Sequence, residues 1–144
     1  MSVRENICAD VVTTLQAISS PVAPKFVTRE PFDFEKLSNA QFPACLVQTA
    51  GEVRGDATIE GTSTLRQSEL TIQIFGFVKG ASIDTARNQL IEAIENGLDA
   101  DRTRGGYAID TQVTEVETDE GAIDPVGGVV VTVSVLYTFT RGNA

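Results

Sequence analysis

Residues 129–140, VVVTVSVLYTFT, decide the fold, because two sets of side chains alternate there along the chain. Strict alternation with a period of two is the pattern of a β-strand. One set is apolar or aromatic throughout and consists of Val129, Val131, Val133, Val135, Tyr137 and Phe139. The other set, from Val130 to Thr140, carries no charge either. We therefore predict a long strand with two covered faces, which points to an assembly partner and not to a substrate.

The segments before this strand predict a strand, a helix and a second strand. Residues 65–79 alternate like a strand, and Gly76 between two phenylalanines indicates a bulge or a close backbone approach. Residues 82–98 carry apolar side chains at helical spacing, and the stem of Arg87 lies along that stripe. Residues 107–117 predict a strand in which Val116 is out of phase, so we expect a bulge near Thr114.

The N-terminal part adds a second amphipathic helix over residues 3–19, with Ser2 as its N-cap. A short strand at 25–28 and a longer one at 42–49 follow, with an irregular segment between them. Two helices and five or six strands, mostly joined as hairpins, predict an α+β fold. We expect one domain over residues 1–144, with two layers: an antiparallel or mixed sheet and two helices on one of its faces.

Composition argues against several kinds of function, including nucleic-acid binding and insertion into a membrane. The chain has 144 residues and a net charge of −9, which argues against a nucleic-acid-binding surface. Cys8 and Cys45 have no metal or redox spacing, so buried free thiols are the favoured interpretation, with a disulfide between them as the alternative. No run approaches the roughly 18 apolar residues of a membrane span. Residues 105–124 contain no basic side chain, which indicates either a solvated hairpin or a surface that repels a polyanion.

The sequence offers little site chemistry. Histidine, the commonest general base, is absent. There is no nucleotide-binding glycine loop and no Gly-x-Ser-x-Gly motif. The acidic group Glu117, Asp119, Glu120 and Asp124 lacks the spacing of a calcium loop. We therefore predict no catalytic, cofactor-binding or metal-binding residue and no enzyme activity.

Residues 51–64 are polar and lack apolar periodicity beyond Val53 and Ile59. They predict a mobile loop, or a hairpin whose ends lie in the sheet. A polar segment of this length in a small domain usually moves or has a function.

The order of these segments resembles the tail terminator (tail completion) proteins of long-tailed bacteriophages. The likeness covers most of the chain, but its motifs are weakly specific. It is carried by the following stretches: the opening helix Arg4 to Ser19, QFPACLV at 41–47, ELTIQIFGFV at 69–78, the helix Asp84 to Leu98, and Val129 to Thr140.

The resemblance implies a homohexameric ring on the head-proximal end of the tail tube. Such a ring ends tube polymerisation, presents a surface to head-completion or neck proteins and lets DNA pass without specific binding. The protein would be assembled in the bacterial host cytoplasm and reside in the virion. No cofactor and no membrane are implied.

Three groups of residues are candidates for roles in such a ring. An acidic lumen would include Asp119, Glu120 and Asp124, with a solvated outer loop as the alternative. Subunit contacts would include Phe75, Phe77, Val78 and Leu136. The polar segment would contact the tube or the neck through Arg54, Asp56 and Glu60.

Two other functions stay open from the sequence. A head–tail connector or neck protein of similar fold would show the same pattern. A small α+β ligand-binding module would need a concave pocket with converging polar groups.

Overall fold

A computed structural model describes residues 2–56, 65–121, 123, 125–142 and 144. The helices are α1 (Val3–Gln16) and α2 (Ile83–Asp99), with short 3₁₀ turns η1 (Phe34–Lys36) and η2 (Asn39–Gln41). The strands are β1 (Phe26–Thr28), β2 (Ala44–Asp56), β3 (Leu65–Lys79), β4 (Asp110–Thr118) and β5 (Val126–Thr140). Within these residues the strands form a single sheet in the order β1-β2-β3-β5-β4.

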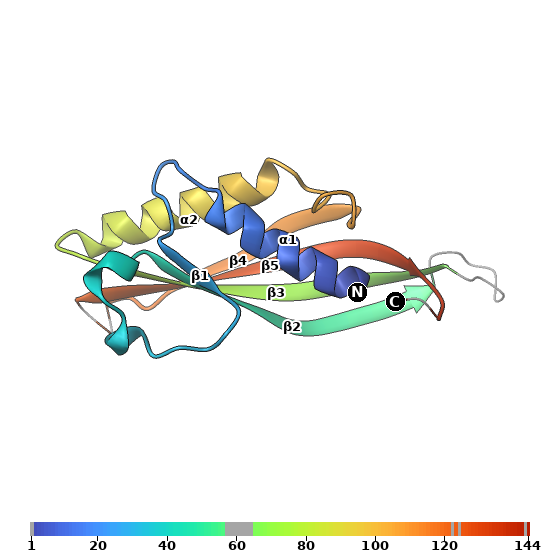
Figure 1. Cartoon of the computed structure of the whole chain (residues 1–144), viewed down its shortest axis with the longest axis horizontal. Helices are drawn as coiled ribbons and strands as arrows, with labels where there is room; N and C mark the ends of the chain where they lie inside the picture. The colour runs from blue at the N-terminus through green and yellow to red at the C-terminus, as the bar shows by residue number, and fades with distance from the viewer. Residues whose placement is uncertain (1, 57–64, 122, 124, 143) are drawn as a thin grey trace.

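The sheet is mixed, because β1 pairs with β2 in parallel while the other pairs are antiparallel. Both helices lie on the same side of it (Figure 1). The predicted two-layer α+β architecture is therefore confirmed.

The core lies between the helices and one face of the sheet. The first side-chain set of β5, from Val129 to Phe139, is buried there as predicted. Leu90, Ile94 and Leu98 of α2 cover it together with Ile7, Val11 and Leu15 of α1. Gly76 is the close approach that the sequence indicated, since a Cβ on it would lie 2.7 Å from Leu90 Cδ2.

Local interactions explain where the elements begin and bulge. The Ser2 side chain accepts a hydrogen bond from the Glu5 N–H at 3.1 Å and caps α1. The register of β4 against β5 shifts between Val113 and Glu115, which confirms the bulge near Thr114. β4 begins only at Asp110, because Arg104, Gly105 and Gly106 have positive φ and form a turn first.

β2 is longer than the predicted strand, which was to end at Thr49. A bulge between Thr49 and Glu52 resets the register, and pairing with β3 continues to Asp56. Residues 51–56 are therefore strand, which agrees with the interpretation of residues 51–64 as a hairpin whose ends lie in the sheet. The segment has no alternation of apolar residues, and its strand conformation is held by backbone pairing with β3. Residues 57–64, including Glu60, lie outside the described residues.

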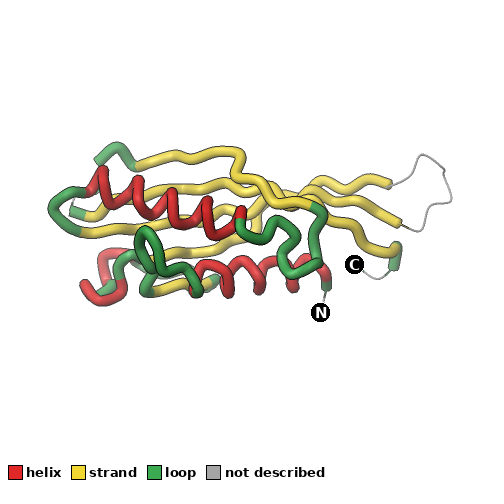
Figure 2. The backbone as a smooth tube through the Cα atoms, turned by 90° about the horizontal axis from the view of Figure 1, so that it is seen from above, coloured by secondary structure: helices red, strands yellow, loops and turns green. Residues whose placement is uncertain are grey.

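The sheet is longer than the helical layer. At one end the strands continue past both helices (Figure 2). At the other end, the segment before β2 folds around the sheet and places Phe32 and Phe34 against Phe77, with ring centroids 5.7 and 5.2 Å from it. Two aromatic rings therefore pin this segment to the sheet.

Candidate assembly surfaces

The sheet face opposite α1 and α2, here called the open face, carries neither of these helices. The segment around η1 packs on one end of it, where Phe34 stacks on Phe77. The alternation of β3 and β5 places their partly exposed side chains there. The sequence predicted two covered faces for the last strand, yet α1 and α2 cover only one of them. The open face is formed by Leu46, Gln48, Val53, Gln67, Glu69, Thr71, Gln73, Phe75, Phe77, Asp110, Gln112, Glu115, Glu117, Val130, Thr132, Ser134, Leu136 and Thr138.

None of these open-face residues is a lysine or an arginine, although Arg102 reaches the Asp110 carboxylate at the rim from the turn after α2. Its centre consists of glutamine, threonine and serine, and its carboxylates are Glu69, Asp110, Glu115 and Glu117. Its apolar end, next to Phe75 and Phe77, has a notch of about 220 Å³ that Val130 and Ile123 also line. The face therefore combines an apolar end with an uncharged polar centre.

Three of the four predicted subunit-contact residues lie on this face: Phe75, Phe77 and Leu136 are each partly exposed there. Val78 is different, because its side chain is 2% exposed and belongs to the core under the helices. Val78 lies on the face of β3 that is turned toward the helices, together with Leu70, Ile72 and Ile74. Val78 is thus unavailable for contact with a second copy, which corrects that assignment.

The predicted acidic lumen residues differ from one another. The Asp119 carboxylate accepts a hydrogen bond from Arg87 Nη1 at 2.5 Å, and its side chain is only 14% exposed. Backbone N–H groups of Gly128 and Ile123, with Arg87, hold the pKa of Asp119 below its ordinary value despite burial. Asp119 is therefore neutralised within the fold. Glu120 is exposed, whereas Asp124 lies outside the described residues.

The acidic character of β4 comes from its last residues, all of which are exposed from Thr114 to Thr118. Glu115 and Glu117 lie on the same face, two positions apart. Hydrogen bonding with Glu117 and the repulsion of its charge raise the pKa of Glu115. These two glutamates are an unneutralised acidic edge.

The opposite edge of the sheet carries arginines around the buried carboxylate of Glu52. Tyr137 Oη donates to Glu52 Oε1 at 2.5 Å, Arg54 pairs with the same carboxylate, and Arg4 of α1 lies 3.8 Å from it. Burial raises the pKa of Glu52, but hydrogen bonds from Tyr137 and Arg54 and the charge of Arg54 bring it below its ordinary value. The Arg54 guanidinium also lies over the Phe139 ring, 4.7 Å from its centroid. Glu52 thus joins α1, β2 and β5.

The predicted contact residues of the polar segment lie beside this network. Arg54 is one of its members, while the Asp56 carboxylate pairs with Arg66 at 3.3 Å and Arg141 at 2.9 Å. Both belong to β2 and not to a loop. The third, Glu60, is not described.

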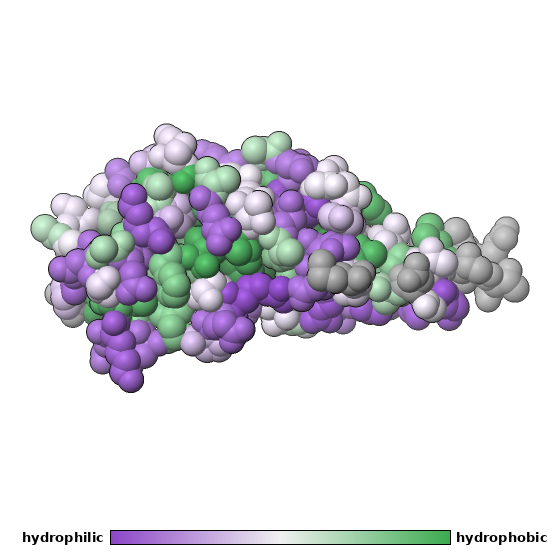
Figure 3. Space-filling view, in the orientation of Figure 1, coloured by the Kyte–Doolittle hydropathy of each residue, from purple (hydrophilic) through white to green (hydrophobic). Residues whose placement is uncertain are grey.

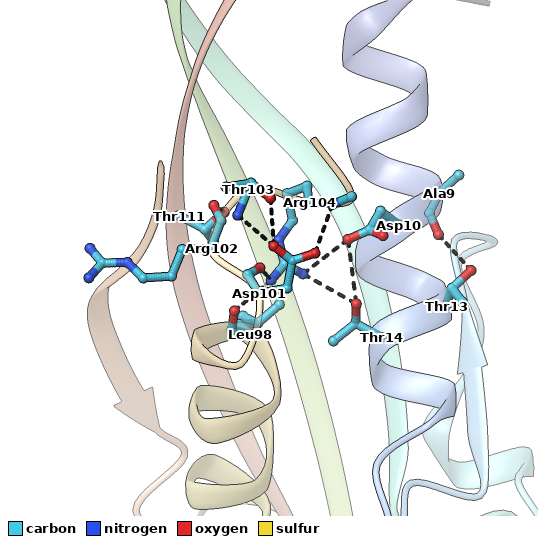
Figure 4. A network of polar contacts seen from close by, with 11 residues as sticks. Ala9, Asp10, Thr13, Thr14, Leu98, Asp101, Arg102, Thr103, Arg104 and Thr111 are labelled. Carbon is cyan, nitrogen blue, oxygen red and sulfur yellow. Dashed lines mark hydrogen bonds and ion pairs between the residues drawn. The ribbon is translucent and has the colours of Figure 1, made fainter. Parts of the chain in front are cut away.

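The turn after α2 contains a buried arginine that the sequence did not single out (Figure 4). The Arg104 side chain is fully buried, donates to the Leu98 carbonyl at 2.5 Å and to the Asp101 carbonyl, and pairs with Asp10 of α1 at 3.3 Å. Hydrogen bonds from the Thr103 hydroxyl and from the backbone of Gly105 and Thr103 lower the pKa of Asp101 to about 2. Arg102, two positions earlier, instead pairs with Asp110 at the surface.

Chemical machinery is sparse in the described part of the chain. No group of three or more cysteine and acidic side chains gathers there to hold a metal ion. Cys8 and Cys45 are free and buried, as predicted, and burial raises the pKa of Cys45 to about 12. Neither described helix is long and apolar enough to cross a membrane.

A cavity of about 480 Å³ lies between the first turns of α2, the start of β2 and the end of β3. Its lining is mostly apolar, with Lys79, Asn39 and Gln89 as its polar members. Hydrophobic residues also gather left of centre in the surface view of Figure 3, among hydrophilic ones. The cavity falls in the usual size range of ligand pockets.

Comparisons with known proteins give a likeness in fold. No protein-family model matches the chain, and no curated protein matches it in sequence. The structure is similar to a chain of a solved structure described as "Virion of native gene transfer agent (GTA) particle". The TM-score is 0.62 at 14% sequence identity, and the match covers 95% of this chain and 98% of that chain.

Proposed function

We propose that this protein is a structural component of a phage-like virion, and more specifically the tail terminator. In this role it forms a ring, a homohexamer, on the head-proximal end of the tail tube. The ring ends polymerisation of the tube protein and offers a docking surface to a head-completion or neck protein. DNA passes through it without specific binding.

One observation carries this proposal: the fold matches that of a chain in a gene transfer agent virion over nearly the full length of both chains. The open face supports it, because a polar sheet face with an apolar end and no cluster of basic side chains suits contact with other proteins better than with nucleic acid. Glu120 is the remaining described candidate for an acidic lumen, and Phe75, Phe77 and Leu136 remain candidates for subunit contacts.

Electron micrographs of particles from producing cells that lack the protein test this function. Over-long tails are the result expected for a terminator. Tails of normal length without heads would instead assign the chain to the neck, as a head–tail connector. Complementation with the wild-type chain, and with a variant changed at the exposed Glu92 of α2, serves as the control.

A second candidate function, a small ligand-binding module, is favoured only by the 480 Å³ cavity. It predicts a monomer that releases a bound small molecule on denaturation. Native mass spectrometry of the purified chain separates it from the assembly function.

A further inference from the structure

We propose that copies of this chain associate head to tail through the two edges of the sheet, with β4 of one copy pairing antiparallel to β2 of the next. The inference rests on the ring in the proposed function and names the surfaces that would form it. The two edges are the outer sides of β4 and of β2 beyond the short β1.

Both edges have backbone groups free for pairing. Among the described strands, β4 pairs with β5 alone, and β2 pairs with β1 only from Ala44 to Leu46. Residues 47–56 of β2 and 110–118 of β4 are nearly equal in length, about 30 Å at the usual strand rise. A row of unpaired N–H and C=O groups is a template for another strand.

The direction of the two strands fits an extended sheet. Three antiparallel steps separate them, from β2 to β3, from β3 to β5 and from β5 to β4. β2 and β4 of one copy therefore run in opposite directions. A second copy in the same orientation brings its β2 antiparallel to the first copy's β4, which is the arrangement of the three pairs within the chain.

The charges of the two edges favour pairing of β4 with β2 over pairing of two β4 edges. The β4 edge carries Glu115 and Glu117, both exposed, so two β4 edges would repel each other. The β2 edge is bordered by Arg4, Arg29 and Arg54, whose side chains are each more than a third exposed. Arg4 and Arg54 share the Glu52 carboxylate, which is only 6% exposed, and Arg29 pairs with Glu5 of α1. Three arginines against two carboxylates leave this border with an excess of positive charge.

Bulges and charges also protect the edges of monomeric sheets. Protection alone does not require opposite signs on the two edges, whereas a head-to-tail contact does. Such a heterologous contact closes into a ring when the rotation between copies permits it. The open face then continues from one copy to the next.

Cross-linking of engineered cysteines tests the pairing directly. One variant carries Glu117→Cys on β4 and a second carries Gln48→Cys on β2, because both positions lie on the open face and would share one side of a continuous sheet. Glu117 is exposed and Gln48 partly exposed, while the natural thiols are buried. A short bis-maleimide should link copies only when the two variants are mixed. Links within the Glu117→Cys sample alone, or no links in the mixture, would overturn the proposal.

Charge reversal gives an independent readout in sedimentation equilibrium of the full chain. Glu115→Lys/Glu117→Lys should weaken self-association by about tenfold or more, because arginines would then face lysines. Glu92→Lys/Glu95→Lys on α2 makes the same change in net charge away from both edges and should associate like the wild type.

Equal weakening in both double variants, or a wild-type chain that stays monomeric, contradicts edge pairing. Thermal unfolding shows whether each variant remains folded. The micrographs that test the tail function do not depend on these results, so the two proposals can fail separately.

Discussion

At the scale of single residues, Arg102 and Arg104 show how neighbours of one type can have opposite roles. Arg102 is half exposed and pairs with Asp110 at the surface. Arg104 is fully buried and ties the end of α2 to Asp10 and Thr14 of α1. Removing a buried charge leaves its partners without compensation, whereas an exposed pair contributes little.

We predict that Arg104→Ala lowers the free energy of unfolding by about 3–5 kcal/mol. Arg102→Ala, two positions away, should cost at most about 1 kcal/mol. Urea denaturation of both variants at neutral pH measures the difference. Similar losses for the two would contradict the structural role of Arg104.

Gly76 provides a second test at this scale. A Cβ at this position would lie 2.7 Å from Leu90 Cδ2 and 2.8 Å from Val129 Cγ2, and both side chains are buried. Gly76→Ala should therefore destabilise the fold by about 1–3 kcal/mol through overpacking. Gly55→Ala is the matched control in β2, since nothing lies within 4 Å of its added Cβ. Chemical denaturation that finds no difference between the two would show that the core adapts.

At the scale of elements, sequence periodicity predicts the helices, β3 and β5 well. Their apolar residues recur with the helical or the strand period because one face of each is buried. It misjudges β2, where residues 51–56 have no such pattern. Residues 51–56 form a strand because they pair with β3 at the end of the sheet. That pairing depends on the folded structure and leaves no pattern in the local sequence.

The assembly surfaces are predictable to a smaller extent. Gly76 interrupts the apolar run of β3, so the sequence could not separate the face of Phe75 and Phe77 from that of Val78. The alternation itself held the answer: Val78 lies an even number of positions from Ile72 and Ile74, so it shares their buried face. Asp119 pairs with Arg87, 32 positions earlier, and no local pattern indicates so distant a partner.

The Glu52 network predicts a pH effect on how α1, β2 and β5 hold together. The pKa of Glu52 is lower in the folded chain than in the unfolded one, so its contribution is complete above the unfolded value. It is lost as the pH falls through the folded pKa. We expect the wild-type free energy of unfolding to decrease from about pH 5 to pH 3 more steeply than that of Glu52→Gln. If the free energies of unfolding of the two proteins change with pH in the same way, Glu52 does not contribute to the pH dependence of stability.

At the scale of the whole molecule, two electrostatic terms of different range act between copies. The net charge of −9 repels copies over long distances. The opposite charges of the β4 and β2 edges attract only near contact. Salt screens over about 30 Å at 0.01 M, about 10 Å at 0.1 M and about 3 Å at 1 M. Moderate salt therefore removes the repulsion first, and high salt weakens the edge contact as well.

Head-to-tail association should accordingly pass through a maximum as the salt concentration rises. Sedimentation equilibrium of the full chain across about 0.01–1 M NaCl measures this dependence. Glu115→Lys/Glu117→Lys should lose the maximum, because its edges no longer attract, while Glu92→Lys/Glu95→Lys should keep it. A steady increase of association up to the highest salt would instead indicate contact through the apolar end of the open face, since burial of apolar surface is not weakened by screening.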